Sequence, residues 1–466
     1  MYLYQLRTTF LLIVATYALL KVAPAHAQFQ PPDNVTVIMY QLNSDGSILK
    51  GEDTNEPIPC IKGNASYGCT SDSSKPYPFA SSTITISIDG SNGPDNNVYV
   101  YPYLWDVVPQ ELDMNGSQGN KPLAAVKAQM IAARTYIYQR LTYIDQYGTP
   151  NNSTQFHVFL PYRYQALTLP QRVRVQAAAL ERLYLSEANS TYPLEALYGA
   201  DNPADTVAGN RPYLQSVPDP ISAAYGTLNG TGNGGMSSKG ISRWAFGHTS
   251  SRGPVAVGQP NYPHDDGGNG DFWPVRLDDA AQLLTHYYTG IHLRDAGNGN
   301  AVKTPAYRWA PLRIDAPVST CTNANVPVAL WVQNTGTAEW AAHTIIAVIT
   351  NLTATPAAVT TLQANEIPTA VPVGDTVVIT HTVQPTFAGT FTYRVDFYTA
   401  AVGLFSQQTP AWPRYEQFTL AAVDCQARLY LPVVQSSQFT SVQAQSNQQA
   451  ATNALDHAQW LPIVVR

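Results

Sequence analysis

The sequence predicts an α+β protein in which short strands surround one long helix and a β-sandwich follows. Apolar and polar residues alternate within the first hundred positions, for example over residues 83–88, which is the pattern of half-buried strands. Apolar residues then recur every three or four positions from Leu123 to Ile144, which is the period of a helix. After residue 312 the alternation returns at the spacing of a small sandwich.

The first strands are expected between Val35 and Tyr103. Residues 83–88 and 98–101 alternate, and the Asp-Gly, Asn-Gly and Gly-Pro pairs between such segments favour turns. Strands therefore lead into the segment that begins at Tyr103, and further strands and turns are expected over residues 156–197.

The long helix is expected to have Pro122 at its first position, where a missing N–H costs little. Lys127 and Arg134 lie on one face of it, near the apolar stripe. From there, the two side chains could hold the backbone or the carboxylate of the segment around Glu111. The alternative interpretation is that both are ordinary charges in contact with solvent. The stripe predicts an amphipathic helix and consists of Leu123, Val126, Met130, Ala133, Ile137, Leu141 and Ile144.

The C-terminal sandwich is expected over residues 312–426, after an Asn/Gly/Pro-rich linker near residue 305. The segment Trp331-Val332-Gln333-Asn334-Thr335-Gly336, followed by Trp340, resembles a turn of bacterial immunoglobulin-like surface modules. The sandwich carries no acid–base cluster, so a spacer or a glycan-binding adhesion role is expected for it.

The two ends of the chain carry targeting and low-complexity features. Arg7, an apolar run over residues 10–20 and the Ala25-His26-Ala27 end predict a signal peptide cut after Ala27. The run is shorter than the roughly 20 residues of a membrane span, although an uncleaved anchor is the alternative. We therefore expect a secreted or cell-wall-associated protein with no membrane span after cleavage. Residues 427–466 are predicted to be a Gln/Ser/Ala-rich tail, with two similar apolar pieces that are either edge strands or an attachment element.

Four cysteines fit an exported protein, in which thiols are oxidised. The simplest pairing joins Cys60 to Cys69 as a local staple and Cys321 to Cys425 across the sandwich. Zinc is the rival interpretation, but no histidine lies near Cys60 or Cys69.

Composition limits the partners. Charged residues make up 12% of the chain and the formal net charge is -6, so the basic patch that nucleic-acid binding needs is absent from the sequence. The 28 tyrosines are suited to stacking on sugar rings.

Glu111 is the candidate catalytic residue. Val107, Val108, Pro109 and Leu112 surround it in sequence, and an apolar environment raises the pKa of a carboxyl group. Such a group holds a proton near neutrality and can deliver it to a leaving oxygen, which is the chemistry of glycosidic bond cleavage. The alternative is that Glu111 only stabilises the start of the following helix.

The order of residues 103–135 resembles that of one protein family. The segments YL-x-x-VVP-x-E (residues 103–111) and A-x-KAQ-x-x-AART (residues 125–135) resemble the signature of the sporulation stage II protein D domain, also called the LytB or amidase-enhancer domain. Two further pieces, PYLQSVPDP at 212–220 and LLTHYYTG at 283–290, resemble its later segments. The predicted organisation is a signal peptide (1–27), this domain (28–304), an immunoglobulin-like sandwich (312–426) and the tail (427–466).

The middle of the chain departs from the family pattern. The GHGVGMSQ-x-GA element has no clear counterpart: one alignment runs over residues 240–245 and includes Ser242, with Ser237 at the place of the histidine. The other takes Gly235-Met236-Ser237 as the core and His248 as part of a displaced Gly-His pair. The Ser-x-Gly-Gly-x-Thr segment is also missing.

The resemblance implies a peptidoglycan lytic transglycosylase in which Glu111 alone serves as acid and base on glycan strands. Activation of an N-acetylmuramoyl-L-alanine amidase, or a structural protein that retains only the fold, are the alternatives. Neither cofactor nor metal is expected, although some family members bind zinc and the Asp/Gly-rich residues 265–271 invite a calcium interpretation. The residues expected to bind substrate or shape the site are Tyr103, Lys127, Gln129, Arg134, Ser237, Ser242 and His248.

Overall fold

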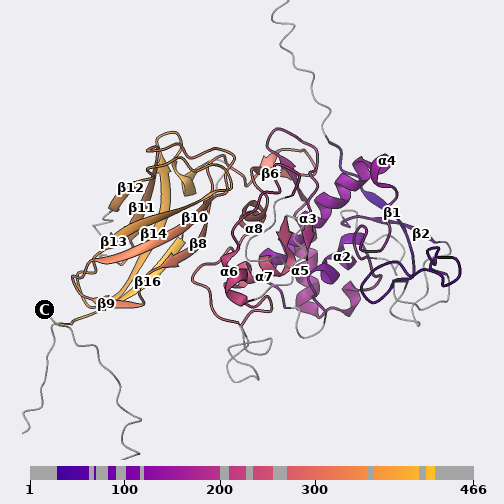
Figure 1. Cartoon of the computed structure of the whole chain (residues 1–466), viewed down its shortest axis with the longest axis horizontal. Coiled ribbons are helices and arrows are strands. Elements are labelled where there is room, and N and C mark those ends of the chain that lie inside the picture. Colours follow the sequence, from indigo (N-terminus) through magenta and orange to yellow (C-terminus); the bar gives the residue numbers. More distant parts are fainter. Residues whose placement is uncertain are drawn as a thin grey trace, which may run out of the picture. The chain divides into compact units, whose positions relative to one another are not determined.

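The computed structural model describes residues 29–61, 68–69, 82–90, 101–115, 120–199, 209–226, 235–254, 270–353, 361–408 and 416–425 (Figure 1). The predicted signal peptide, most of the predicted strand at 98–101, most of the Asp/Gly-rich loop and the tail after residue 425 lie outside these ranges. Within them, no helix has both the length and the apolar character needed to cross a membrane.

The N-terminal part combines helices with short sheets, as the α+β prediction requires. Strands β1 (Asn34–Ile38) and β2 (Thr83–Ser87) pair antiparallel, and β3 (Leu183–Glu187), β6 (Ile291–Asp295) and β7 (Ala301–Val302) form a second sheet. The two-residue strands β4 (Tyr198–Gly199) and β5 (Met236–Ser237) pair in parallel. The helices are α2 (Tyr103–Glu111), α3 (Leu123–Thr142), α4 (Ile144–Tyr147), η2 (Tyr164–Ala166), α5 (Leu169–Leu180), α6 (Pro220–Tyr225), α7 (Ser238–Phe246) and α8 (Ala280–Tyr287).

Helix α3 is where the apolar period placed it, but it is not amphipathic. Almost every side chain from Ala124 to Arg140 is buried, because α2, α5, α7, α8 and β3 all pack against it. The ends of the predicted stripe, Leu123 and Ile144, are instead about two-fifths exposed, at 39% and 40%. The expected apolar stripe is therefore part of a helix buried on all sides.

Helix α2 was not expected. The predicted strands end at Tyr103 and no helix was predicted between them and the long helix, yet residues 103–111 form a helix with Pro109 inside it. Asp106 explains part of this, since its carboxylate accepts hydrogen bonds from the backbone N–H groups of Tyr162 (3.2 Å) and Tyr164 (2.8 Å). It thereby fixes α2 against the turn that follows the irregular segment 148–161.

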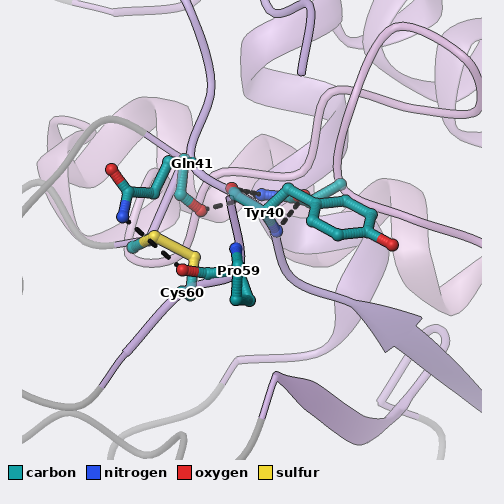
Figure 2. The surroundings of a disulfide bond; sticks show 7 residues. Tyr40, Gln41, Pro59 and Cys60 are labelled. Atoms are coloured by element: carbon teal, nitrogen blue, oxygen red, sulfur yellow. Dashed lines mark hydrogen bonds between the residues drawn. A yellow bond between two sulfur atoms is a disulfide. The ribbon is translucent and has the colours of Figure 1, made fainter. Parts of the chain in front are cut away.

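The local staple is present: Cys60 and Cys69 are joined, with their Cα atoms 5.5 Å apart. Figure 2 shows this disulfide beside Tyr40, Gln41 and Pro59. The Asn152 side chain ties the same region together by accepting from the N–H of Tyr40 and donating to its carbonyl and to that of Gly68. Cys321 and Cys425 are also disulfide-bonded, so zinc has no free thiol to bind.

Replacing Cys60 and Cys69 together by serine is expected to lower the free energy of unfolding by about 2–3 kcal/mol. The closed loop is short, with a sequence separation of 9, and chain entropy assigns such a loop a stabilisation of this order. Urea unfolding of the two proteins measures it. An unchanged midpoint would mean that Asn152 alone holds the segment.

The C-terminal part is a β-sandwich that begins at Trp309, a few residues earlier than predicted. One sheet has the order β13-β10-β8, and the other has the order β12-β11-β14-β16-β9, with β15 paired to β14. Strand β9 runs parallel to β16 and brings Cys321 opposite Val423. The strands are β8 (Trp309–Asp315), β9 (Ser319–Cys321), β10 (Val326–Asn334), β11 (Ile345–Asn351), β12 (Thr361–Glu366), β13 (Thr376–Val383), β14 (Gly389–Thr399), β15 (Gly403–Leu404) and β16 (Glu416–Val423), with the short helix η3 (Phe405–Gln407) after β15.

The Asn-Thr-Gly turn of the sandwich has a structural role. The Asn334 side chain accepts from the Gly336 N–H (3.0 Å) and donates to the carbonyls of Ala338 and Val371, both at 3.0 Å. Trp340, which follows the turn, is fully buried beside Phe397. The residues that carried the resemblance to immunoglobulin-like modules therefore fix a turn and a core position.

Candidate active site

Glu111 is the last residue of α2, so it cannot stabilise the start of that helix. The C-terminal end of a helix presents backbone carbonyls and the negative end of the helix dipole, which disfavour a carboxylate. A purely stabilising acid belongs at the opposite end. Glu111 therefore occupies a place that costs stability when it is ionised.

The surroundings of Glu111 favour its protonated form. Burial raises the pKa of the Glu111 carboxyl from its ordinary value of 4.5 to about 7, and a hydrogen bond from the Val158 backbone opposes this only in part. Val107 and Val108, the apolar neighbours seen in the sequence, are completely buried. The expectation of a carboxyl group that is protonated near neutrality is met by the structure.

Two pockets meet at Glu111. One has a volume of about 420 Å³ and is lined by the end of α2, the start of α7 and residues 251–252. The other, of about 250 Å³, is lined by Tyr136 of α3, residues 154–158 and the start of β4. Glu111 lines both. A chain-like substrate that occupies both pockets would pass the carboxyl group.

The smaller pocket has an aromatic wall. The ring of His157 lies 4.7 Å from that of Tyr136 and 5.9 Å from that of Tyr198, measured between centroids. The Tyr103 hydroxyl lies 3.2 Å from His157 Nδ1. Burial lowers the pKa of His157 to about 3, so the ring is neutral at any physiological pH. Among the described residues, neither His157 Nε2 nor the buried Tyr198 hydroxyl has a hydrogen-bond partner.

These aromatic residues were not predicted, apart from Tyr103. His157 and Tyr198 come from segments without regular motifs, and nothing in their sequence surroundings marks them. Tyr136 follows directly after the AART segment, so the helical period alone would have placed it on α3 beside the motif.

The larger pocket is basic. The exposed Lys239 and Arg252 line it together with the buried Lys121 and Arg243. Lys121 donates to the Ser251 carbonyl at 2.8 Å, and Arg243 donates to the Thr249 carbonyl at 2.9 Å, so the two buried cations fix the walls. The exposed pair offers positive charge to a ligand.

Lys127 and Arg134 do not hold the segment around Glu111. Lys127 pairs with Glu181 at 2.9 Å, and Arg134 donates to the backbone carbonyls of Ala179, Glu181 and Leu183. Both therefore hold the connection between α5 and β3. The structure gives these two motif cations a role in the fold rather than contact with either pocket at Glu111.

Gln129 and the serines lie near the larger pocket. Ser238, which lines that pocket, donates to Gln129 Oε1 at 3.0 Å, and both residues are buried. Ser237 caps α7 by accepting from the Gly240 N–H, while Ser242 donates to the Ser238 carbonyl. The Gly235-Met236-Ser237 alignment thus leads directly into the pocket wall. The alternative stretch, 240–245, lies inside α7.

His248 and His286 are packed inside the fold. His248 is completely buried and its Nδ1 accepts from the Ser250 N–H at 3.1 Å, and His286 Nδ1 lies 2.7 Å from Gln333 Oε1. Within the ranges that the structure describes, His, Cys, Asp and Glu side chains form no group of three suited to a metal ion.

The family-like segments converge on Asp219. Its carboxylate, fully buried at the start of α6, accepts from Tyr287 Oη (2.6 Å) and from Trp244 Nε1 (3.0 Å). Three distant pieces, PYLQSVPDP, α7 and LLTHYYTG, are thereby joined. A Cβ atom at Gly240 would overlap the Tyr287 hydroxyl, which explains the glycine there.

The candidate site lies in a segment that matches the model of a known protein family. Residues 91–182 match the family model described as SpoIID, Stage II sporulation protein. This segment, about a fifth of the chain, contains α2, Glu111 and α3. The chain therefore carries a SpoIID domain, and this family implies a cell-wall-related function.

Likeness to solved structures is weak. The CARDB domain of a Pyrococcus furiosus protein is 12% identical, with a TM-score of 0.20, and the match covers 27% of this chain and 94% of that one. A β-glucosidase from Listeria innocua (10% identity, TM-score 0.17, 25% and 16% covered) and a Niemann-Pick type C2 protein from the Japanese carpenter ant (7%, 0.17, 26% and 95%) are similar to the same degree. No curated protein matches the chain.

The raised pKa of Glu111 predicts a pH-dependent stability difference. A carboxyl with a raised folded-state pKa contributes stability below its unfolded value of 4.5, and this contribution is lost as pH rises through about 7. Glu111→Gln removes this ionisable group, so the variant and the native protein should have the same free energy of unfolding at pH 4.5. Above pH 7 the free energy of unfolding of the variant should be higher by about 1–3 kcal/mol. Thermal melts across this range test it, and a difference independent of pH would contradict the raised pKa.

Proposed function

We propose that the protein is a peptidoglycan lytic transglycosylase that cleaves the bond between N-acetylmuramic acid and N-acetylglucosamine. The observation that carries the proposal is Glu111, a carboxyl group with a pKa of about 7 at the junction of two pockets, within the matched SpoIID segment. A group with this pKa is present in both protonation states at neutral pH, so it suits a reaction that needs first an acid and then a base.

In this reaction Glu111 transfers its proton to the glycosidic oxygen while the bond from that oxygen to C1 of the muramic acid breaks. The resulting carboxylate then takes the proton of the same sugar's C6 hydroxyl, and O6 bonds to C1. The product is a 1,6-anhydro ring, and Glu111 ends protonated as it began. Water takes no part.

The lining of the pockets supports a single-acid mechanism. Paired-acid glycosidases hold two carboxyl groups about 5–9 Å apart. Among the described residues that line the two pockets, Asp113 is the other acid, and it is exposed just beyond the end of α2. The Asp113 side chain is exposed to solvent, unlike the carboxyl group of Glu111 at the junction of the two pockets.

Other lining residues fit the proposed substrate. Lys239 and Arg252 supply positive charge to the larger pocket, which suits the carboxylates that peptidoglycan carries. In the smaller pocket, His157 Nε2 and the Tyr198 hydroxyl offer hydrogen bonds to sugar hydroxyl or N-acetyl groups beside aromatic faces. The SpoIID match and this lining point to the same substrate class.

The second candidate function is activation of an N-acetylmuramoyl-L-alanine amidase without glycan cleavage. The departure from the GHGVGMSQ element favours it, since with Gly235-Met236-Ser237 as the core, Ser238 lines the larger pocket where the family pattern has glutamine.

Purified cell wall distinguishes the two functions. Incubated with the protein alone, the wall should release soluble glycan fragments, and adding an amidase should not be required. Release only in the presence of the amidase, and at the same level for Glu111→Gln, would contradict the transglycosylase and favour the activator.

A further inference from the structure

A third pocket, of about 320 Å³, lies outside the site described above. It is lined by the C-terminal end of α3, by helix α4, by residues between the last position of β3 and Glu195, and by the segment around Tyr213. Tyr213 anchors one wall, because its hydroxyl accepts from the Glu195 N–H at 3.0 Å. No step of the proposed reaction uses this pocket.

Two of the tyrosine rings that line this pocket are partly exposed to solvent. Tyr143, at the end of α3, is 44% exposed, and Tyr192 is 37% exposed. Large apolar surfaces are usually covered in a folded protein, and aromatic rings at a pocket rim provide flat faces against which sugar rings stack.

Gln139 supplies an unused polar atom. The residue is only 5% exposed and lines the pocket, and its Oε1 has no hydrogen-bond partner within the part of the chain that the structure describes. Its Nε2 lies 3.4 Å from Tyr147 Oη, which is a long contact. A buried acceptor without a partner is costly, and a ligand with an O–H or N–H donor would satisfy it.

The charged side chains that line this pocket are Glu195, Arg211 and the exposed Glu187, so they add no excess positive charge. Glu195 is paired with Arg140 at 2.9 Å and with Arg211 at 3.5 Å. The larger pocket at Glu111 differs, because four basic side chains and two acidic ones line it. A neutral polar ligand therefore fits this third pocket better than an anionic one.

A row of stacked side chains links this pocket to the smaller pocket at Glu111. The Arg140 guanidinium lies over the Tyr147 ring at 3.8 Å and over the Tyr136 ring at 4.5 Å. Tyr147 lines the third pocket and Tyr136 lines the pocket of His157. The two cavities are neighbours that share one stack.

We infer that the third pocket is a distal subsite for neutral N-acetylated sugar units, which extends the glycan-binding path from the pocket of His157 across the Tyr136–Arg140–Tyr147 stack. This inference rests on the proposed function for its substrate class. The open tyrosine faces and the unused Gln139 acceptor suit the rings and the N–H and O–H groups of N-acetylglucosamine.

The test measures binding of β-1,4-linked N-acetylglucosamine oligomers by calorimetry, with Glu111→Gln as the background so that no cleavage occurs. Tyr143→Ala and Tyr192→Ala are each expected to weaken binding of the hexamer by about 3- to 10-fold, the loss of one ring contact. Binding of the dimer, which does not reach both cavities, should not change. Tyr398→Ala, which removes a 39% exposed tyrosine from β14, is the matched control and should leave both affinities unchanged.

Equal hexamer affinity in all variants, or no hexamer binding by the parent, would overturn the distal subsite. Neither result bears on bond cleavage, which is measured separately as fragment release by the active protein. A parent that binds the hexamer through these tyrosines but releases nothing from cell wall would keep the subsite and reject the transglycosylase.

Discussion

Glu111→Gln is expected to lower the rate of glycan cleavage by about 10²- to 10⁴-fold, the range typical for the loss of an acid–base group. The amide has the size of the carboxyl and can still accept the hydrogen bond from the Val158 backbone. It cannot donate a proton to the glycosidic oxygen or remove one from the C6 hydroxyl. The rate on purified glycan strands is the measurement.

The matched control is Asp113→Asn. Asp113 lines the same pocket two residues further on but is exposed, and its positive φ of 51° is one that asparagine adopts readily. We expect the rate of glycan cleavage by Asp113→Asn to stay within a few-fold of that of the native protein. If the two substitutions had equal effects, or if Glu111→Gln kept full activity, Glu111 would not be the acid.

Arg134→Met is expected to lower the free energy of unfolding by about 3–5 kcal/mol. The guanidinium is completely buried and donates to three carbonyls at 3.0–3.1 Å, and its Nε lies 3.5 Å from Asp89 Oδ2. Methionine fills similar space but leaves those carbonyls and the buried Asp89 carboxylate without this donor. Urea unfolding gives the value.

Lys127→Met provides the comparison within the same motif. Lys127 also pairs with the α5–β3 connection, through Glu181, but its side chain is 27% exposed and Lys303 contacts the same carboxylate. For such a partly exposed ion pair, we expect Lys127→Met to lower the free energy of unfolding by less than about 1 kcal/mol. Similar losses for both variants would mean that Arg134 does not organise the fold as the structure indicates.

The fold was partly predictable from the sequence, and α3 shows where prediction reached its limit. Its apolar period gave the position of the helix to within a residue or two at each end. Its burial on all sides did not follow, because Gln129, Arg134 and Arg140 of α3 look like a polar face in a single sequence. The neighbours that cover this face come from α5, α7 and α8, far away in the sequence.

The candidate site was predictable to a similar extent. Glu111 and its raised pKa followed from the apolar residues beside it, which pack as α2 forms. Lys127 and Arg134 were expected to shape the site, but they hold the α5–β3 connection instead. The sequence could not show this, because the position of a residue on a helix does not reveal which segment packs against it. His157 and Tyr198 reach the site from irregular or two-residue elements, and tertiary contacts alone bring them there.

The most direct test of the mechanism is mass spectrometry of cell-wall digests made in water enriched in ¹⁸O. If Glu111 directs the C6 hydroxyl onto C1, the muramic acid ends carry 1,6-anhydro rings and no label, and Glu111→Gln releases almost none of them. Muramic acid ends that are reducing and carry one ¹⁸O atom would show that water attacks instead, which would contradict the proposed transglycosylase.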